Sequence, residues 1–180
     1  MAVSLPYELG DHIRIHLAQY YPAISDSVIG GDVGDPLEAG DVVKALKAVT
    51  LDPVENPETN QYIKLYVVNI SDQVLREVAV YLSPNIGIWS VAVENTKNKT
   101  DTTYTGGDVF PTDVLTPDGF QLCQSLDSAL PVAETLEPGD KIAVWVNGVV
   151  KYEDLFRNPG VKPSCAVIVV YAAVAETQGG

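Results

Sequence analysis

Two adjacent runs of β-forming residues constrain the fold of this chain more than any other stretch. Residues 61–84 read QYIKLYVVNISDQVLREVAVYLSP, and both runs are rich in Val, Ile, Leu and Tyr. Alternate side chains share one face of a strand, so a period of two gives each run one apolar face. The polar segment 71–75 between the runs predicts two neighbouring antiparallel strands. The residues predicted on the core face are Ile63, Leu65, Val67, Val78, Val80 and Leu82.

Further strands are predicted on both sides of this pair. HIRIHL at 12–17 alternates apolar and polar residues, IWSVAVEN at 88–95 is β-rich, and a Pro-Gly-Asp turn precedes an alternating strand within 136–150. The run at 165–175 is apolar on both faces over its first half, which is typical of a central strand or of a strand that an arm or a neighbouring subunit covers. Many short strands with turns between them indicate an all-β, antiparallel β-sandwich, Ig-like or jelly-roll-like.

The first third of the chain differs in composition from the rest. Residues 23–60 are rich in Gly, Pro and Asp, and residues 1–60 hold ten acidic and three basic side chains. Prolines and glycines at this density interrupt regular structure, so we expect a long connection with a short element at 42–49. The expected organisation is an N-terminal strand and extended acidic arm over 1–60, joined in one structural unit to a β-sandwich domain over 61–180.

Charge and composition exclude several classes of partner. The net charge is −13 and the pI is about 4.3, whereas nucleic-acid binding requires clustered Lys and Arg. The sequence has no apolar run long enough to cross a membrane, and its start has no secretory signal pattern. We therefore expect a protein made in the cytoplasm, with no nucleic acid and no membrane as partner. Cys123 and Cys165 are expected to be reduced, packed thiols.

No stretch of the sequence has the pattern of a catalytic site. G-x-S-x-G, P-loop, G-x-G-x-x-G, H-E-x-x-H and C-x-x-C motifs are all missing, so we expect no enzyme and no cofactor. His12 and His16 have a zinc-like spacing, but they lie on a predicted strand without a third ligand, and we expect no metal there. Four acids of the arm offer oxygen ligands for calcium without the register of an EF-hand, so solvated loop acids are the favoured interpretation. They are Asp32, Asp35, Glu38 and Asp41.

The order of these segments resembles small β-sandwich structural proteins of tailed bacteriophages. The resemblance rests on 66–69 (YVVN), 136–139 (LEPG) and 144–146 (VWV), and the chain departs from that pattern with Asn147-Gly148 after the tryptophan. It implies a virion component made in the host cytoplasm and acting by protein–protein contacts, as a capsid decoration or cement protein. The alternative within this group is a neck or tail component. The implied partners are the major capsid or neck and tail proteins, with the chain a homo-oligomer in the particle.

Four aromatic residues are candidates for an interface. Tyr66, Tyr81 and Trp145 are predicted to project from the faces opposite the core, and Trp89 begins its strand. Either a partner or another segment of the same chain covers them. A second class of function is a carbohydrate-binding or adhesion sandwich, in which Trp89, Tyr104 and Trp145 stack on sugar rings.

Overall fold

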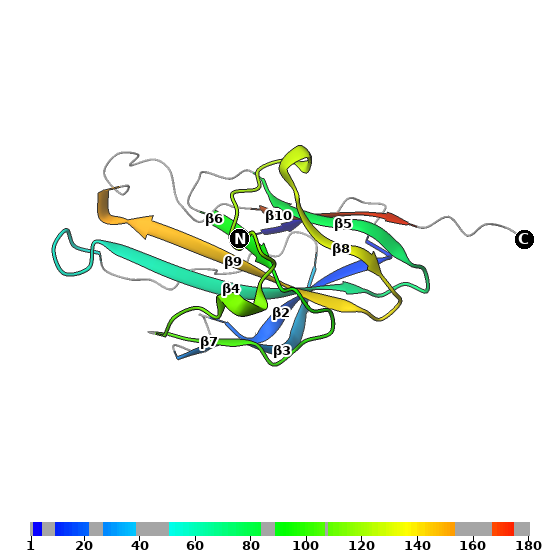
Figure 1. Ribbon diagram of the computed structural model, residues 1–180, viewed down its shortest axis with the longest axis horizontal. Helices are drawn as coiled ribbons and strands as arrows, with labels where there is room; N and C mark the ends of the chain where they lie inside the picture. The colour runs from blue at the N-terminus through cyan, green and yellow to red at the C-terminus, as the bar shows by residue number, and fades with distance from the viewer. Residues whose placement is uncertain are drawn as a thin grey trace, which may run out of the picture.

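The strands of this chain pack as two β-sheets in the computed structural model (Figure 1). The structure describes residues 2–4, 10–21, 27–38, 51–83, 89–106, 108–153 and 167–174. The strands and two short 3₁₀ helices are β1 (Ala2–Ser4), β2 (Ile13–Tyr20), β3 (Val28–Leu37), β4 (Glu58–Asn69), β5 (Leu75–Leu82), β6 (Trp89–Val93), β7 (Thr103–Thr105), η2 (Thr112–Val114), η3 (Leu126–Ser128), β8 (Leu130–Leu136), β9 (Lys141–Lys151) and β10 (Val167–Val174).

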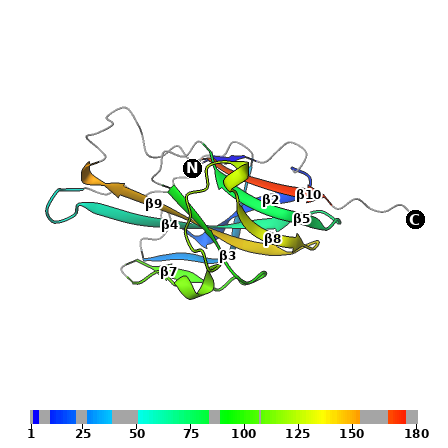
Figure 2. The same ribbon diagram turned by 45° about the horizontal axis from the view of Figure 1, so that its top comes forward.

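One sheet has four strands and the other has six. The four-stranded sheet has the order β1-β10-β5-β8, and the six-stranded sheet has the order β6-β9-β4-β2-β3-β7. All neighbours are antiparallel except β1 and β10, which are parallel. Figure 2 shows β5 and β10 on one side of β4 and β9, and β3 and β7 on the other. The all-β sandwich predicted from the sequence is therefore confirmed.

The main core lies between the two sheets. The period of two in the sequence correctly predicts which residues of the strands face this core. The predicted apolar faces of β2, β4, β5 and β9 all belong to one buried cluster, which β6, β8 and β10 complete. Ile15, Leu65, Val80 and Val144 in this cluster are wholly shielded from solvent. Burial of such side chains stabilises the fold by about 1.5–3 kcal/mol each.

The two runs at 61–84 are not a hairpin, which corrects the sequence prediction. β4 belongs to the six-stranded sheet and β5 to the four-stranded sheet. The crossing is made at Asn69, whose side chain is buried and accepts hydrogen bonds from the backbone and side chain of Ser71. The same amide donates to the carbonyls of Gln73 and Leu136, each at 2.8 Å. Such an Asx turn redirects the chain, so each strand pairs with a partner from elsewhere in the sequence.

Much of the predicted arm belongs to the sheets. Residues 28–37, expected to be part of a long connection, form β3, and β2 lies between β3 and β4. The Gly-Gly pair in β3 has positive φ angles of 106° and 77°, and the register of β3 against β2 shifts along its length. These irregularities bend β3, so a sequence rich in Gly, Pro and Asp is compatible with a strand here. The predicted element at 42–49 and Cys165 lie outside the described residues.

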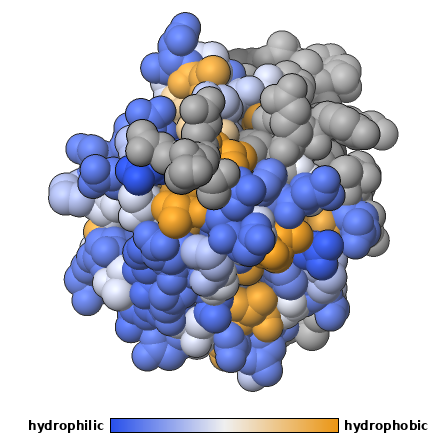
Figure 3. Space-filling view, turned by 90° about the vertical axis from the view of Figure 1, so that its right-hand side faces the viewer, coloured by the Kyte–Doolittle hydropathy of each residue, from blue (hydrophilic) through white to orange (hydrophobic). Residues whose placement is uncertain are grey.

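The paired ends of β4 and β9 project as a ribbon, which is visible at the left of Figure 1. We call residues 58–62 and 147–151 the β4–β9 ribbon. β6 still pairs with Asn147 and Gly148 on the β9 side, whereas no strand of the described residues pairs with 58–62 on the β4 side. The opposite end of the sandwich, viewed in Figure 3, shows mainly hydrophilic residues with separate small apolar patches on its described part. Among the described residues, no helix has the length and apolar character needed to span a bilayer.

Candidate functional site

The outer face of the six-stranded sheet, which points away from the four-stranded sheet, carries a buried ionic group. Lys64 and Tyr66 on β4, Trp145 on β9 and Glu94, directly after β6, are all buried. Lys64 is paired with Trp145 across the ladder between β4 and β9. Tyr66 is paired with Ala143, whose carbonyl accepts a hydrogen bond from the Glu94 backbone. Because β9 lies between β4 and β6, Lys64 and Glu94 approach each other across β9.

The two charged side chains form an ion pair with no solvent contact. Lys64 Nζ lies 3.1 Å from Glu94 Oε1, and both side chains are 0% exposed. Glu94 accepts two further hydrogen bonds, from Trp145 Nε1 at 2.8 Å and from Thr102 Oγ1 at 3.3 Å. Lys64 Nζ also donates to the Thr102 carbonyl at 3.1 Å. Charge-assisted hydrogen bonds of this kind offset the cost of burying two charges. We call Lys64, Glu94, Thr102 and Trp145 the buried charge network.

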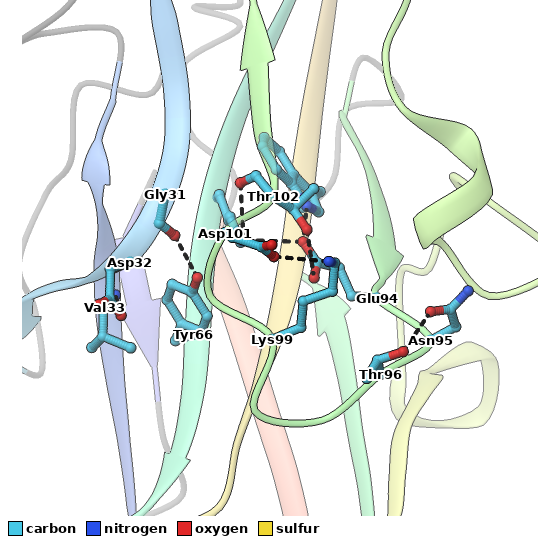
Figure 4. A network of polar contacts seen from close by, with 12 residues as sticks. Gly31, Asp32, Val33, Tyr66, Glu94, Asn95, Thr96, Lys99, Asp101 and Thr102 are labelled. Atoms are coloured by element: carbon cyan, nitrogen blue, oxygen red, sulfur yellow. Dashed lines mark hydrogen bonds and ion pairs between the residues drawn. The ribbon is translucent and has the colours of Figure 1, made fainter.

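The network is closed by the covering segment, residues 95–106, and by β3. The Thr102 carbonyl accepts a second hydrogen bond, from the backbone N–H of Gly31 at 3.0 Å. The Tyr66 hydroxyl donates to the Gly31 carbonyl, as Figure 4 shows. Above them, Lys99 and Asp101 form an ion pair at 2.8 Å that is open to solvent on the Asp101 side. The covering segment and β3 are thus fastened to each other and to β4.

Burial controls the electrostatics of this site. Desolvation lowers the pKa of Lys64, and the neighbouring Glu94 carboxylate offsets part of that effect. Desolvation also raises the pKa of Tyr66, and the negative charge of Glu94 adds to this shift. The Lys64 ammonium lies 4.9 Å from the centre of the Tyr66 ring and 5.5 Å from that of Trp145. Both rings therefore present π-electron density to the cation.

An aromatic cluster continues from Trp145 along the same face. Phe110 packs edge-on against Trp145 with ring centres 4.9 Å apart, and Tyr62 stacks on Phe110 at 4.5 Å. Tyr104 from β7 and Phe120 complete the cluster, at 4.9 and 5.6 Å from Tyr62. Burial, with a smaller effect from Tyr104, raises the pKa of Tyr62. The cluster is a second, smaller core that attaches the loop after β7 to the sheet.

The predicted interface residues do not lie together on an exposed face. Tyr66 and Trp145 do project opposite the main core, but both are fully buried, because β3 and the covering segment of the same chain cover them. Trp89 faces inward and belongs to the main core between the sheets. Tyr81 is partly buried in β5 of the other sheet. Of the two alternatives that the sequence leaves open, cover by another segment of the same chain describes Tyr66 and Trp145, while Trp89 is buried between the sheets.

The burial of these tryptophans argues against the carbohydrate-binding alternative. Trp89 and Trp145, two of the three aromatic residues considered for stacking, have no face open to a glycan. Tyr104 is partly exposed, but its ring packs against Tyr62 and Phe110. These three residues therefore do not form the flat, accessible aromatic platform on which a sugar ring stacks.

The other sequence candidates are placed apart from the network. His16 Nδ1 lies 2.9 Å from the Gly34 carbonyl, while Asp32 and Asp35 lie exposed on β3. Asp41 is outside the described residues. Within the described ranges, no three His, Cys, Asp or Glu side chains are grouped as a metal site requires. Cys123 is a free, buried thiol, and burial raises its pKa.

The two charged residues of the network stand out in the sequence, but periodicity alone does not predict that they contact each other. Lys64 is the only charged residue in the apolar run YIKLYVV, and Glu94 ends the run VAVE. Each position falls on the face opposite the core, so each resembles an ordinary solvent-exposed charge. Only the topology, which places β9 between β4 and β6, brings the two together.

Comparison with known proteins does not assign the chain to a family. No family model matches it, and neither a curated protein nor a solved structure matches it. The fold and the site described above are therefore the observations on which a function has to be argued.

Proposed function

We propose that this chain is a structural component of a tailed-bacteriophage virion, acting as a capsid decoration or cement protein through protein–protein contacts. The single observation that carries this proposal is the β4–β9 ribbon, which extends from the sandwich and whose β4 edge, at Asn60 and Tyr62, has no strand partner among the described residues. The segmental resemblance of 66–69, 136–139 and 144–146 to small phage structural proteins agrees with it.

The hydrogen-bonding register of β4 identifies the open edge. Backbone groups alternate in direction along a strand, and the Asn69 and Pro57 backbones bond on the β9 side. The positions of Asn60 and Tyr62 differ from that of Asn69 by odd numbers, so their N–H and C=O groups point to the opposite side, away from β9. The β2 partner ends at Leu65, opposite Leu17. Among the described residues, no strand pairs with 58–62 on that side.

Such an edge is a template for an added strand. Edge N–H and C=O groups without a strand partner, as at Asn60 and Tyr62 among the described residues, bond readily with an extended segment of another chain. This is how β-augmentation joins proteins. Glu58 and Asn60 are exposed, and the tip is held by an ion pair of 3.6 Å between Glu58 and Lys151. The ribbon is thereby preformed, which reduces the entropy that binding has to offset.

The charge of the chain is compatible with assembly on a larger particle. A net charge of −13 keeps free copies apart in the host cytoplasm and favours a partner surface with basic side chains. The partners proposed are the major capsid protein or neck and tail proteins. Many copies in one particle would form a homo-oligomeric array.

The test is to mix the purified chain with particles of its virus that lack it, and to locate the added density by electron microscopy. Density at regular capsid positions is the expected result and supports decoration. Density confined to the portal vertex or the tail would change the assignment to a neck or tail component. A folded chain that binds nowhere on the particle would overturn the virion role.

A further inference from the structure

We propose that Lys64 and Glu94 condense in the folded chain to form an intramolecular amide (isopeptide) bond between Lys64 Nζ and Glu94 Cδ. The inference rests on the closed geometry of the buried charge network and does not depend on the virion role. It assigns a covalent modification to a pair that otherwise is a buried ion pair.

The reacting groups are already in contact. Lys64 Nζ lies 3.1 Å from Oε1 of Glu94, one C–O bond from the carbon that it would attack. Its hydrogen bond to the Thr102 carbonyl fixes the amine, and the Trp145 and Thr102 donors fix the carboxyl group. Well-oriented intramolecular reactions reach effective molarities on the order of 10⁵–10⁸ M. The strands and the covering segment therefore supply the orientation that a free amine and carboxyl lack.

The bond forms without any co-reactant. A proton passes from the ammonium to the carboxylate within the ion pair, which gives a neutral amine and a carboxylic acid. Nζ then attacks Cδ, the Nζ–Cδ bond forms and one C–O bond breaks. The hydroxyl group leaves with a proton from the amine, so the products are one amide and one water molecule. Nothing is oxidised or reduced.

The neighbouring groups match both the transition state and the product. Negative charge develops on the carboxyl oxygens during attack, and the N–H of Trp145 and the O–H of Thr102 are directed at these two oxygens. In the amide, the remaining oxygen keeps the Trp145 donor and the N–H keeps the Thr102 carbonyl. The condensation also removes two charges from a site without solvent, where each carries a desolvation cost of several kcal/mol.

A second lysine–carboxylate pair of the same chain provides a matched control. Lys97 Nζ lies 2.8 Å from Asp140 Oδ2, closer than the buried pair, but 36% of the Lys97 side chain and 17% of the Asp140 side chain are exposed. Water stabilises both charges there, which opposes loss of water from the pair. Only the buried pair is therefore expected to condense.

The measurement is the intact mass of the purified, folded chain, followed by peptide mapping. The expected mass is lower than the sequence mass by one water, and the expected branched peptide joins the segments containing Lys64 and Glu94. Lys97→Arg keeps this loss of water. Lys64→Arg, which cannot form the amide, restores the full mass.

The proposal is overturned if the folded wild-type chain has its full sequence mass and yields Lys64 in an unmodified peptide. That result needs no variant, so it remains decisive even if Lys64→Arg does not fold. A loss of one water that maps to Lys97 and Asp140, with Lys64 recovered in an unmodified peptide, would equally overturn it, because contact without burial would then have decided which pair reacts.

Discussion

At the scale of single residues, the closure of the buried charge network depends on Gly30. Its φ of 106° lies in a region that residues with a side chain rarely adopt. A Cβ atom at this position would lie 2.5 Å from the Thr102 carbonyl oxygen and 2.9 Å from the Trp145 ring. Both contacts involve the network itself, so β3 can approach it only where no side chain intervenes.

Replacing Gly30 by alanine should therefore strain the backbone and, at the same time, open the network. Gly30→Ala is expected to lower the free energy of unfolding by about 3 kcal/mol, measured by urea denaturation. Gly119→Ala is the matched control, because Gly119 also has a positive φ, of 57°, but has open space around its Cβ position. The control should lose about 1 kcal/mol from backbone strain alone. Equal losses in both variants would show that contact with the network is not the cause.

The sequence identifies single residues of this site only in part. The alternation correctly places Lys64, Tyr66 and Trp145 on the face opposite the main core. It cannot indicate that the covering segment returns over that face, because KNKTDTTYT has the composition of an exposed loop. The closure depends on hydrogen bonds made by the Thr102 backbone, which are independent of side-chain pattern.

At the scale of elements, the covering segment is fastened to the turn before β9 through Asp140. The carboxylate accepts hydrogen bonds from Lys97 Nζ and Asn98 Nδ2, each at 2.8 Å, and from the Glu137 backbone at 3.1 Å. Asn98 in turn exchanges two hydrogen bonds with the Lys141 backbone. The Asn98 and Lys97 hydrogen bonds hold the pKa of Asp140 below its usual value of 3.8.

This interaction predicts a pH dependence with a definite sign. A carboxyl group whose pKa is lower in the folded state stabilises the fold above its unfolded pKa, and that stabilisation is lost as the pH falls through the folded pKa. Asp140→Asn is therefore expected to cost about 1 kcal/mol at neutral pH, a modest value because solvent screens the partly exposed Lys97. The cost should shrink as the pH is lowered below 3.8. Urea denaturation of both proteins at a series of pH values measures it.

Asp118→Asn is the control for this titration, because Asp118 lies exposed in the loop after β7. Its stability should differ little from that of the wild type at every pH. A penalty for Asp140→Asn that stays constant down to acidic pH would contradict the assigned ion pair and hydrogen bonds.

The prediction of elements succeeded where periodicity is regular and failed where tertiary contacts decide. β2, β4, β5 and β9 are recognisable from their alternating pattern, and β6 from its β-forming residues. The pairing of β4 with β5 was wrong, because Asn69 redirects the chain through contacts to β8 that lie far away in sequence. β3 was missed because its glycines and proline suggest a loop. An irregular strand tolerates such residues, and on one side β3 pairs with β7 over only three residues.

At the scale of the whole molecule, the β4–β9 ribbon and β3 differ in how their edges are protected, and no described strand pairs with 58–62 on the side away from β9. β3 pairs with β7 over only three residues, and beyond them it presents Asp32, Asp35 and Pro36, which discourage edge pairing. The edge at 58–62 has no proline and only one charged residue, Glu58. The sandwich therefore offers an added strand better hydrogen bonding on the ribbon than on β3, which is the feature expected of an assembly contact.

This contrast gives a prediction that separates the backbone of the ribbon from its side chains. Asn60→Pro removes a backbone N–H that points to the open edge, and proline is tolerated where no ladder hydrogen bond is lost. Asn60→Ala removes the side chain and keeps the N–H. Both variants should fold, as measured by thermal unfolding, but only the alanine variant should bind particles lacking the chain with an occupancy close to that of the wild type. If the proline variant binds equally well, assembly does not use strand addition at this edge. If the alanine variant fails as well, contacts of the Asn60 side chain, rather than main-chain pairing, hold the partner.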